Sequence, residues 1–63
     1  MEPTFGRKLY TLMVNNALTQ SELARRSGLP KHAIHALTMD QRAPLASEKR
    51  AIAKVFDIEE TDL

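Results

Sequence analysis

Apolar residues recur at helical spacing along this chain of 63 residues, in blocks separated by polar and turn-forming positions. Four apolar residues of the first block share one side of a helix: Phe5, Leu9, Leu12 and Met13. We expect this helix to begin with Pro3 in its first turn or Thr4 as its N-cap, and to end at Asn15 or Asn16. No segment alternates strictly between apolar and polar residues, so the pattern predicts no sheet.

Two short helices joined by a glycine turn are predicted between Leu18 and Leu37. Thr19 and Glu22 have the spacing of a capping box, in which each side chain bonds to the backbone amide of the other residue. Gly28 is expected to end this helix in the left-handed conformation, and Pro30 to stand in the first turn of the next helix. The apolar residues expected to face inward are Leu23, Ala24, Leu29, Ile34 and Leu37.

The C-terminal third of the chain is predicted to form a fourth helix and a short fifth one. Residues 40–44 read as a loop, and Ser47 is expected to cap a helix that runs to about Phe56. Its apolar face would comprise Ile52, Val55 and Phe56, with Leu45 packing at the entry. A short helix over residues 59–62 would place its acids in the first turn, where the helix dipole favours them. We therefore expect one all-α domain over residues 1–63, a compact bundle of four to five short helices.

Composition narrows the function classes. The chain has no cysteine, and its two histidines, His32 and His35, have no second pair of ligands nearby, so we expect no metal and no cofactor. No apolar stretch approaches the roughly 20 residues that span a bilayer, and residues 1–16 lack the layout of a secretory signal. Together with the absence of cysteine, this favours the cytoplasm and no membrane partner. A domain this small has little room for an enzyme cleft, so we expect no catalysis.

Charge is distributed unevenly although the net charge is only +1. Residues 1–44 carry six basic and three acidic side chains, a balance of +3, whereas residues 45–63 carry three and five, a balance of −2. The basic part contains the predicted helix-turn-helix. This polarity is typical of a domain that presents one face to phosphate.

The helix-turn-helix segment reads Q-x-x-L-A-x-x-x-G-L-x-x-x-x-I-x-x-L from Gln20. Ala24 must be small because the two helices touch there, and Gly28 must accept the turn. This motif resembles the lambda-repressor-like helix-turn-helix family, also called the XRE or Cro/C1 type. The resemblance continues through residues 42–44 and 52–63, so it covers nearly the whole chain. It implies a sequence-specific DNA-binding transcriptional regulator, expected to act as a repressor that binds an inverted-repeat operator as a dimer through the major groove.

The resemblance also implies which residues meet DNA. Residues at the start of the third helix would contact base edges, namely Lys31, His32, His35 and Ala36. The expected phosphate contacts are Gln20, Thr38, Arg26 and Arg42. Gln20 lies at a helix N-terminus, where free amides and the helix dipole attract phosphate. For His35 and Arg26 the alternative to a DNA contact is an exposed side chain that binds nothing.

The C-terminal segment offers apolar residues for a dimer contact. Ile58, Leu63 and part of Phe56 would supply a small apolar patch for a two-fold contact, although Phe56 also suits the core of a single copy. No small-molecule ligand is expected. The alternative function is a protein-interaction module with the same fold, such as an antitoxin subunit or an inhibitor of another regulator, which the acidic C-terminal segment favours.

Overall fold

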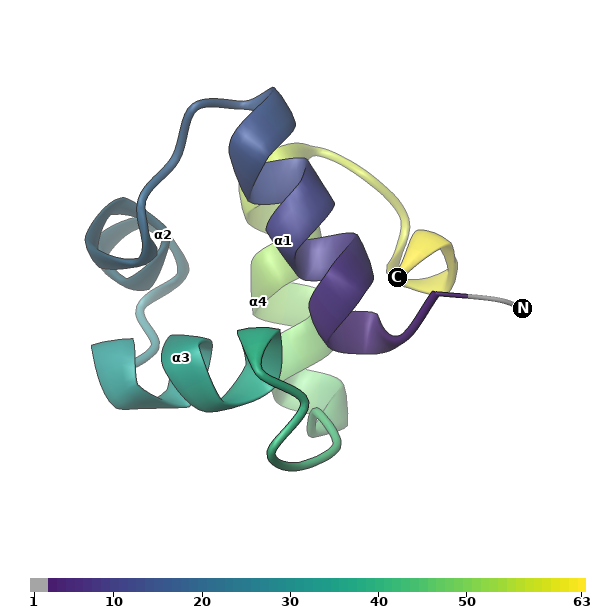
Figure 1. Ribbon diagram of the computed structural model, residues 1–63. Helices are drawn as coiled ribbons and strands as arrows, with labels where there is room; N and C mark the ends of the chain where they lie inside the picture. The colour runs from purple at the N-terminus through teal and green to yellow at the C-terminus, as the bar shows by residue number, and fades with distance from the viewer. Residues whose placement is uncertain (1–2) are drawn as a thin grey trace.

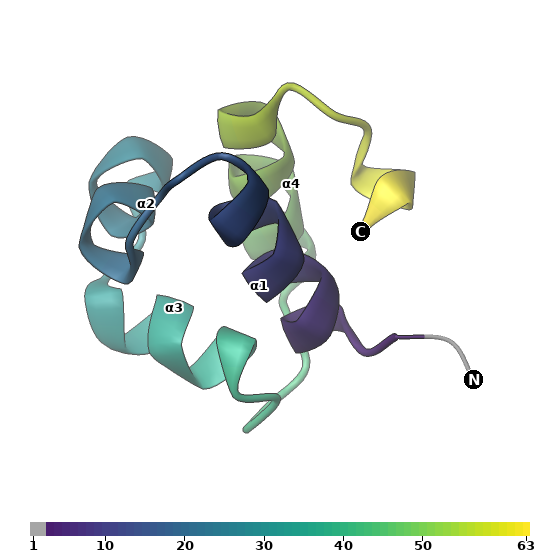
Figure 2. The same ribbon diagram turned by 45° about the horizontal axis from the view of Figure 1, so that its top comes forward.

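The computed structural model describes residues 3–63 and is all-helical over that range, as the sequence predicts (Figure 1). Its elements are α1 Phe5–Asn15, α2 Gln20–Ser27, α3 Lys31–Thr38, α4 Ala46–Phe56 and a one-turn 3₁₀ helix, η1 Glu60–Asp62. The first two residues of the expected domain, Met1 and Glu2, lie outside the described residues. Figures 1 and 2 show α2 and α3 on one side of the molecule and η1 on the other, with α1 and α4 between them. The predicted short fifth helix is thus a single turn.

One hydrophobic core joins all four α-helices. Five large side chains are completely buried: Leu9, Leu23, Ile34, Leu37 and Ile52. Each of them stabilises the fold by about 1.5 to 3 kcal/mol relative to an exposed position. All five belong to the apolar stripes predicted from the sequence. The core also contains Met13 and Ala53, together with Leu63, which returns from η1 and is 8% exposed.

The helix starts follow the predicted caps in part. The hydroxyl of Thr4 accepts a hydrogen bond from the Arg7 backbone N at 3.2 Å, so Thr4 caps α1. Thr19 caps α2 in the same way, through the Glu22 backbone N at 3.1 Å. The predicted second bond of the capping box, from the Thr19 backbone amide to the Glu22 carboxylate, is wrong. The Glu22 carboxylate instead accepts from the guanidinium of Arg25 at 2.7 Å. A charged donor one turn away forms a stronger hydrogen bond than a backbone amide does.

Two other helix starts differ from the prediction. Pro30 is the N-cap of α3 and does not lie in its first turn. The prediction that Ser47 caps α4 is wrong, because the helix begins at Ala46 and Leu45 is the N-cap residue. The carboxylate of Glu48 accepts from the Leu45 backbone N at 2.9 Å, which satisfies this helix end from its third position. The expected packing of Leu45 is also wrong, since its side chain is 61% exposed.

The start of α1 and the end of α3 approach each other closely. Asp40 has a left-handed backbone with φ of 56° and holds its carboxylate over the first turn of α1. That carboxylate accepts from the Gly6 backbone N at 2.9 Å and from the Thr4 hydroxyl at 2.6 Å. A Cβ on Gly6 would lie only 2.6 Å from the Thr38 carbonyl oxygen and 2.7 Å from that of Leu37. The glycine therefore permits the contact, and the anion of Asp40 suits the helix N-terminus.

Candidate nucleic-acid interface

The outer face of α3 lies at the edge of the molecule (Figures 1 and 2). Ala33, Ile34 and Leu37 are buried on its inner side. On the opposite side Lys31, His32 and His35 are exposed, as predicted, while Ala36 and Thr38 are half-buried. Three of the four residues expected at base edges are therefore exposed on one side of a short helix, and the fourth, Ala36, is half-buried.

The turn that sets the angle between α2 and α3 is fixed by local hydrogen bonds. Gly28 has a φ of 78°, the left-handed conformation predicted for it, and its backbone N donates to the Ala24 carbonyl at 3.0 Å. The Ser27 hydroxyl donates to the Ala24 carbonyl at 3.4 Å and accepts from the Leu29 backbone N at 3.2 Å. These contacts hold α3 in one orientation relative to α2. A rigid outer face is what a groove-binding helix needs.

Gln20, His35 and Thr38 form a polar cluster that links the start of α2 to the outer side of α3. The Gln20 side-chain nitrogen Nε2 donates to the Thr38 hydroxyl at 3.3 Å and lies 3.4 Å from His35 Nδ1. When Nδ1 accepts from Gln20, the proton of the neutral ring is on Nε2, which can then donate outward. The Thr38 hydroxyl in turn donates to the Ile34 carbonyl at 2.8 Å. Three of the residues selected from the sequence therefore meet at one place.

Arg42 lies in the loop after α3 and has a partner within the chain. Its guanidinium binds the Glu48 carboxylate through two parallel hydrogen bonds, Nη1 to Oε1 at 2.8 Å and Nη2 to Oε2 at 2.7 Å. The hydrogen bonds from Arg42 and, next, from the Leu45 backbone lower the pKa of Glu48 to about 2. The same pairing raises the pKa of Arg42. This ion pair fastens the loop to α4, a role the sequence did not indicate.

The low pKa of Glu48 predicts a loss of stability in acid. Because the folded pKa is about 2 and the ordinary value is 4.5, the stabilisation is complete above pH 4.5 and disappears as the pH falls towards 2. The Arg42 side chain is 41% exposed and solvent screens the pair, so we expect Glu48→Gln to cost on the order of 1 to 2 kcal/mol at pH 7. Urea unfolding at pH 7 and at pH 2.5 measures this cost.

The difference between the wild type and Glu48→Gln should shrink at pH 2.5. Glu22→Gln is the matched control, because the ion pair of Glu22 with Arg25 is exposed on both sides and should contribute less. Equal stability of Glu48→Gln and the wild type at pH 7 would show that the Arg42–Glu48 pair contributes nothing.

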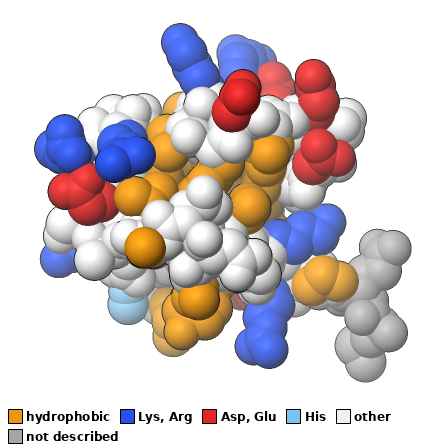
Figure 3. All heavy atoms as spheres, turned by 90° about the horizontal axis from the view of Figure 1, so that it is seen from above, with side chains coloured by type: hydrophobic (Ala, Val, Ile, Leu, Met, Phe, Trp, Pro, Cys, Tyr) orange, Lys and Arg blue, Asp and Glu red, His pale blue; other side chains and the backbone are white. Residues whose placement is uncertain are grey.

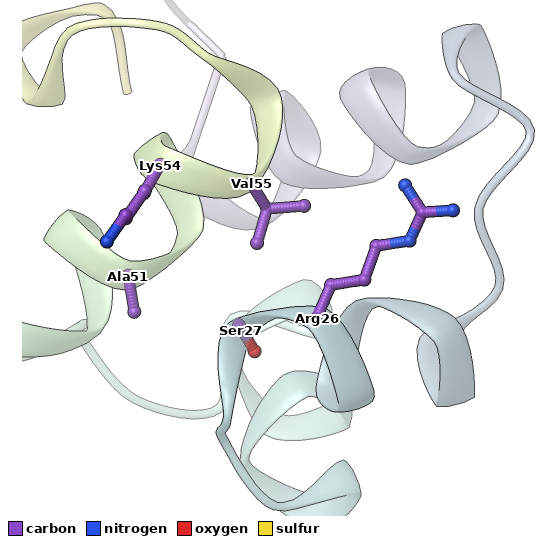
Figure 4. A pocket seen from close by; sticks show the side chains of 5 residues that line it. All are labelled: Arg26, Ser27, Ala51, Lys54 and Val55. Carbon is purple, nitrogen blue, oxygen red and sulfur yellow. The ribbon is translucent and has the colours of Figure 1, made fainter.

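Arg26 lies apart from the other expected phosphate contacts. Its side chain borders a groove between α2 and α4 that is lined by Arg26, Ser27, Ala51, Lys54 and Val55 (Figure 4). Arg26 Nε is 3.6 Å from the Glu22 carboxylate, whereas Gln20 packs against α3. The structure therefore does not bring Arg26 together with Gln20, His35 and Thr38.

The residues expected at a dimer contact lie partly in the core. Leu63 is buried among the core side chains, and Phe56 and Ile58 are half-buried against them. Ile58 nevertheless borders an apolar hollow of about 370 Å³ between α1 and the C-terminal turn, lined by Pro3, Lys8, Thr11, Leu12, Ile58 and Asp62. Ile58 thus retains accessible surface for a contact with a second copy, whereas Leu63 has almost none.

Charged side chains border the face shown in Figure 3. Lys and Arg side chains stand at several of its edges, and most of the acidic side chains in view gather on one side. Between them runs a strip of apolar side chains.

Within residues 3–63 no three His, Cys, Asp or Glu side chains are grouped so that they could hold a metal ion. None of the helices described for that range is long and apolar enough to cross a membrane.

No protein-family model, curated protein or solved structure matches this chain. The resemblance to the lambda-repressor-like family therefore stays a prediction that rests on the sequence motif. The geometry of α2 and α3 carries the functional proposal.

Proposed function

We propose that this chain is a sequence-specific DNA-binding protein that inserts α3 into the major groove and acts as a transcriptional repressor by occupying its operator. The observation that carries the proposal is the exposure of Lys31, His32 and His35 on the outer side of α3, a helix that lies at the edge of the molecule (Figure 1). An α-helix fits the major groove, and only that groove presents a distinct pattern of donors and acceptors for each base pair. We place this activity in the cytoplasm.

Three side chains on the outer side of α3 have a chemical role in this proposal. Lys31 donates to O6 and N7 of a guanine, and His35 donates through Nε2 while Gln20 holds Nδ1. Ala36 offers a methyl group to a thymine methyl. The backbone amides of the first turn of α2, that of Gln20 included, bind a phosphate, which sets the position of α3 along the groove. Arg42 stays bound to Glu48, and its remaining N–H donors face the phosphates of the DNA backbone.

A second copy would pair through the apolar hollow that Leu12 and Ile58 border. One domain covers about half of a symmetric site, so two copies related by a two-fold axis match an inverted repeat. Lys8 and Asp62 both line the hollow and carry opposite charges. A two-fold axis that passes between Lys8 and Asp62 would set Lys8 of each copy opposite Asp62 of its partner.

This pairing predicts a charge-swap rescue. Lys8→Asp and Asp62→Lys each place like charges across the contact, so each should weaken self-association roughly fivefold or more. The double variant restores opposite charges and should return to the wild-type level. Sedimentation equilibrium without DNA measures this directly. A double variant that is as weak as the single variants would place the contact elsewhere.

Selection of bound duplexes from a random pool tests the proposed function. We expect an enriched palindrome that the protein prefers over scrambled duplex by tenfold or more at fixed salt, a modest ratio for specific binding. An enriched sequence without symmetry would retain DNA binding but remove the dimer. Failure of every selected duplex to exceed scrambled DNA would refute the proposal.

A further inference from the structure

The groove between α2 and α4 is separate from the proposed DNA surface. It has a volume of about 420 Å³ and is open to solvent. Figure 4 shows Arg26 and Lys54 at its two ends, with Val55 between them and Ala51 beside Lys54. In Figure 1, α3 lies low in the view, whereas α2 and the greater part of α4 extend above it. A partner in this groove would leave the outer side of α3 free.

The two cations of the groove retain binding capacity. Lys54 is exposed and forms no ion pair with any residue of the described range 3–63. Arg26 contacts the Glu22 carboxylate through Nε at 3.6 Å, but that carboxylate binds Arg25 more closely, at 2.7 Å. The two terminal nitrogens of the Arg26 guanidinium remain available to a carboxylate.

The floor between the cations is small and mostly apolar. The Ser27 hydroxyl is occupied by its own turn, where it donates to the Ala24 carbonyl and accepts from the Leu29 amide. The Ala51 methyl and the Val55 side chain therefore form the accessible floor. A nucleic-acid phosphate backbone could pair with both cations, but it has no apolar group to pack against the Ala51 methyl and the Val55 side chain. A polypeptide with acidic side chains on either side of an apolar one matches both features.

We propose that the α2–α4 groove binds an acidic, apolar segment of a partner protein. Carboxylates of the segment pair with Arg26 and Lys54, and an apolar side chain between them covers Val55. The acidic segment of a second copy is a poor occupant, because Glu60 binds Arg50 at 3.3 Å and Leu63 is buried in its own core. The inference goes beyond DNA binding and does not depend on it.

Amide chemical-shift mapping of the full chain with a synthetic peptide tests this proposal. The probe is the acetylated, amidated hexapeptide EELLEE, and the control is QQLLQQ, which has the same apolar centre without charge. We expect EELLEE to shift the amides of residues 26, 51, 54 and 55 to saturation, and QQLLQQ to bind roughly fivefold more weakly or less. Changes confined to other residues, or no changes at all, would overturn the proposal.

Charge-reversed variants complete the experiment. Arg26→Glu combined with Lys54→Glu should weaken EELLEE binding roughly tenfold or more. Arg7→Glu combined with Lys31→Glu changes the net charge equally outside the groove and should leave peptide binding within about twofold of the wild type. Circular dichroism verifies that both variants fold. Equal losses in the two variants, or a random DNA duplex that shifts the groove amides when EELLEE does not, would contradict a peptide site.

Discussion

Gly6→Ala should unfold the protein at a markedly lower temperature than the wild type. The added Cβ would lie within 2.8 Å of the carbonyl oxygens of Leu37 and Thr38 and of the Asp40 side chain, so α1 must move away from α3. Overpacking of this kind costs about 1 to 3 kcal/mol. The loss is large for a domain of 63 residues, whose total stability is of the order of 3 to 9 kcal/mol. We expect thermal unfolding to shift down by roughly 10 to 20 °C.

The direction of this effect is diagnostic, because helix propensity alone favours alanine over glycine by about 1 kcal/mol. Ser21→Ala is the matched control, since Ser21 is an exposed helical residue, and its change should stay within about 0.5 kcal/mol of the wild type. Thermal and urea unfolding followed by circular dichroism measure both variants. A Gly6→Ala variant as stable as the wild type would show that α1 and α3 do not meet as closely as the structure describes.

The features that the sequence predicts correctly depend on neighbouring residues. The helical spacing of Leu9, Leu23, Ile34, Leu37 and Ile52 selects the core. Thr4 and Thr19 cap through amides three residues away, and Gly28 ends α2 through its own backbone conformation. Such features follow from local geometry, so they can be recognised without knowledge of the tertiary structure.

The features that the sequence does not predict join residues distant along the chain or without regular spacing. Asp40 meets Gly6 across 34 positions, and no local pattern pairs them. Arg42 and Glu48 are six residues apart across a loop, which is not a helical spacing, so the arginine looked free for phosphate. The position of Arg26 beside α4 depends on helix packing. Within the candidate site, the exposure of Lys31 and His32 was predictable, whereas the link between Gln20 and Thr38 was not.

Lys31→Glu should weaken binding to a selected duplex by roughly tenfold to a few hundredfold. The substitution removes a donor to guanine and places a carboxylate against the DNA. It should also reduce the slope of log affinity against log salt by roughly one unit or more, because fewer cations meet the polyanion. Fluorescence anisotropy at several salt concentrations gives both quantities.

Lys54→Glu is the control for Lys31→Glu, since it makes the same charge change on α4, away from the outer side of α3. We expect about a threefold loss or less, which reflects the general field of the protein at moderate salt. Equal losses in the two variants would mean that DNA responds to net charge only, and no role in sequence recognition would remain for Lys31.

Amide chemical-shift mapping with the selected duplex tests most directly that the outer side of α3 is the DNA-binding surface. The account predicts the largest changes at Gln20 and along residues 31–36, with the α2–α4 groove little affected. Largest changes in the groove or on α1, with residues 31–36 unmoved, would contradict it.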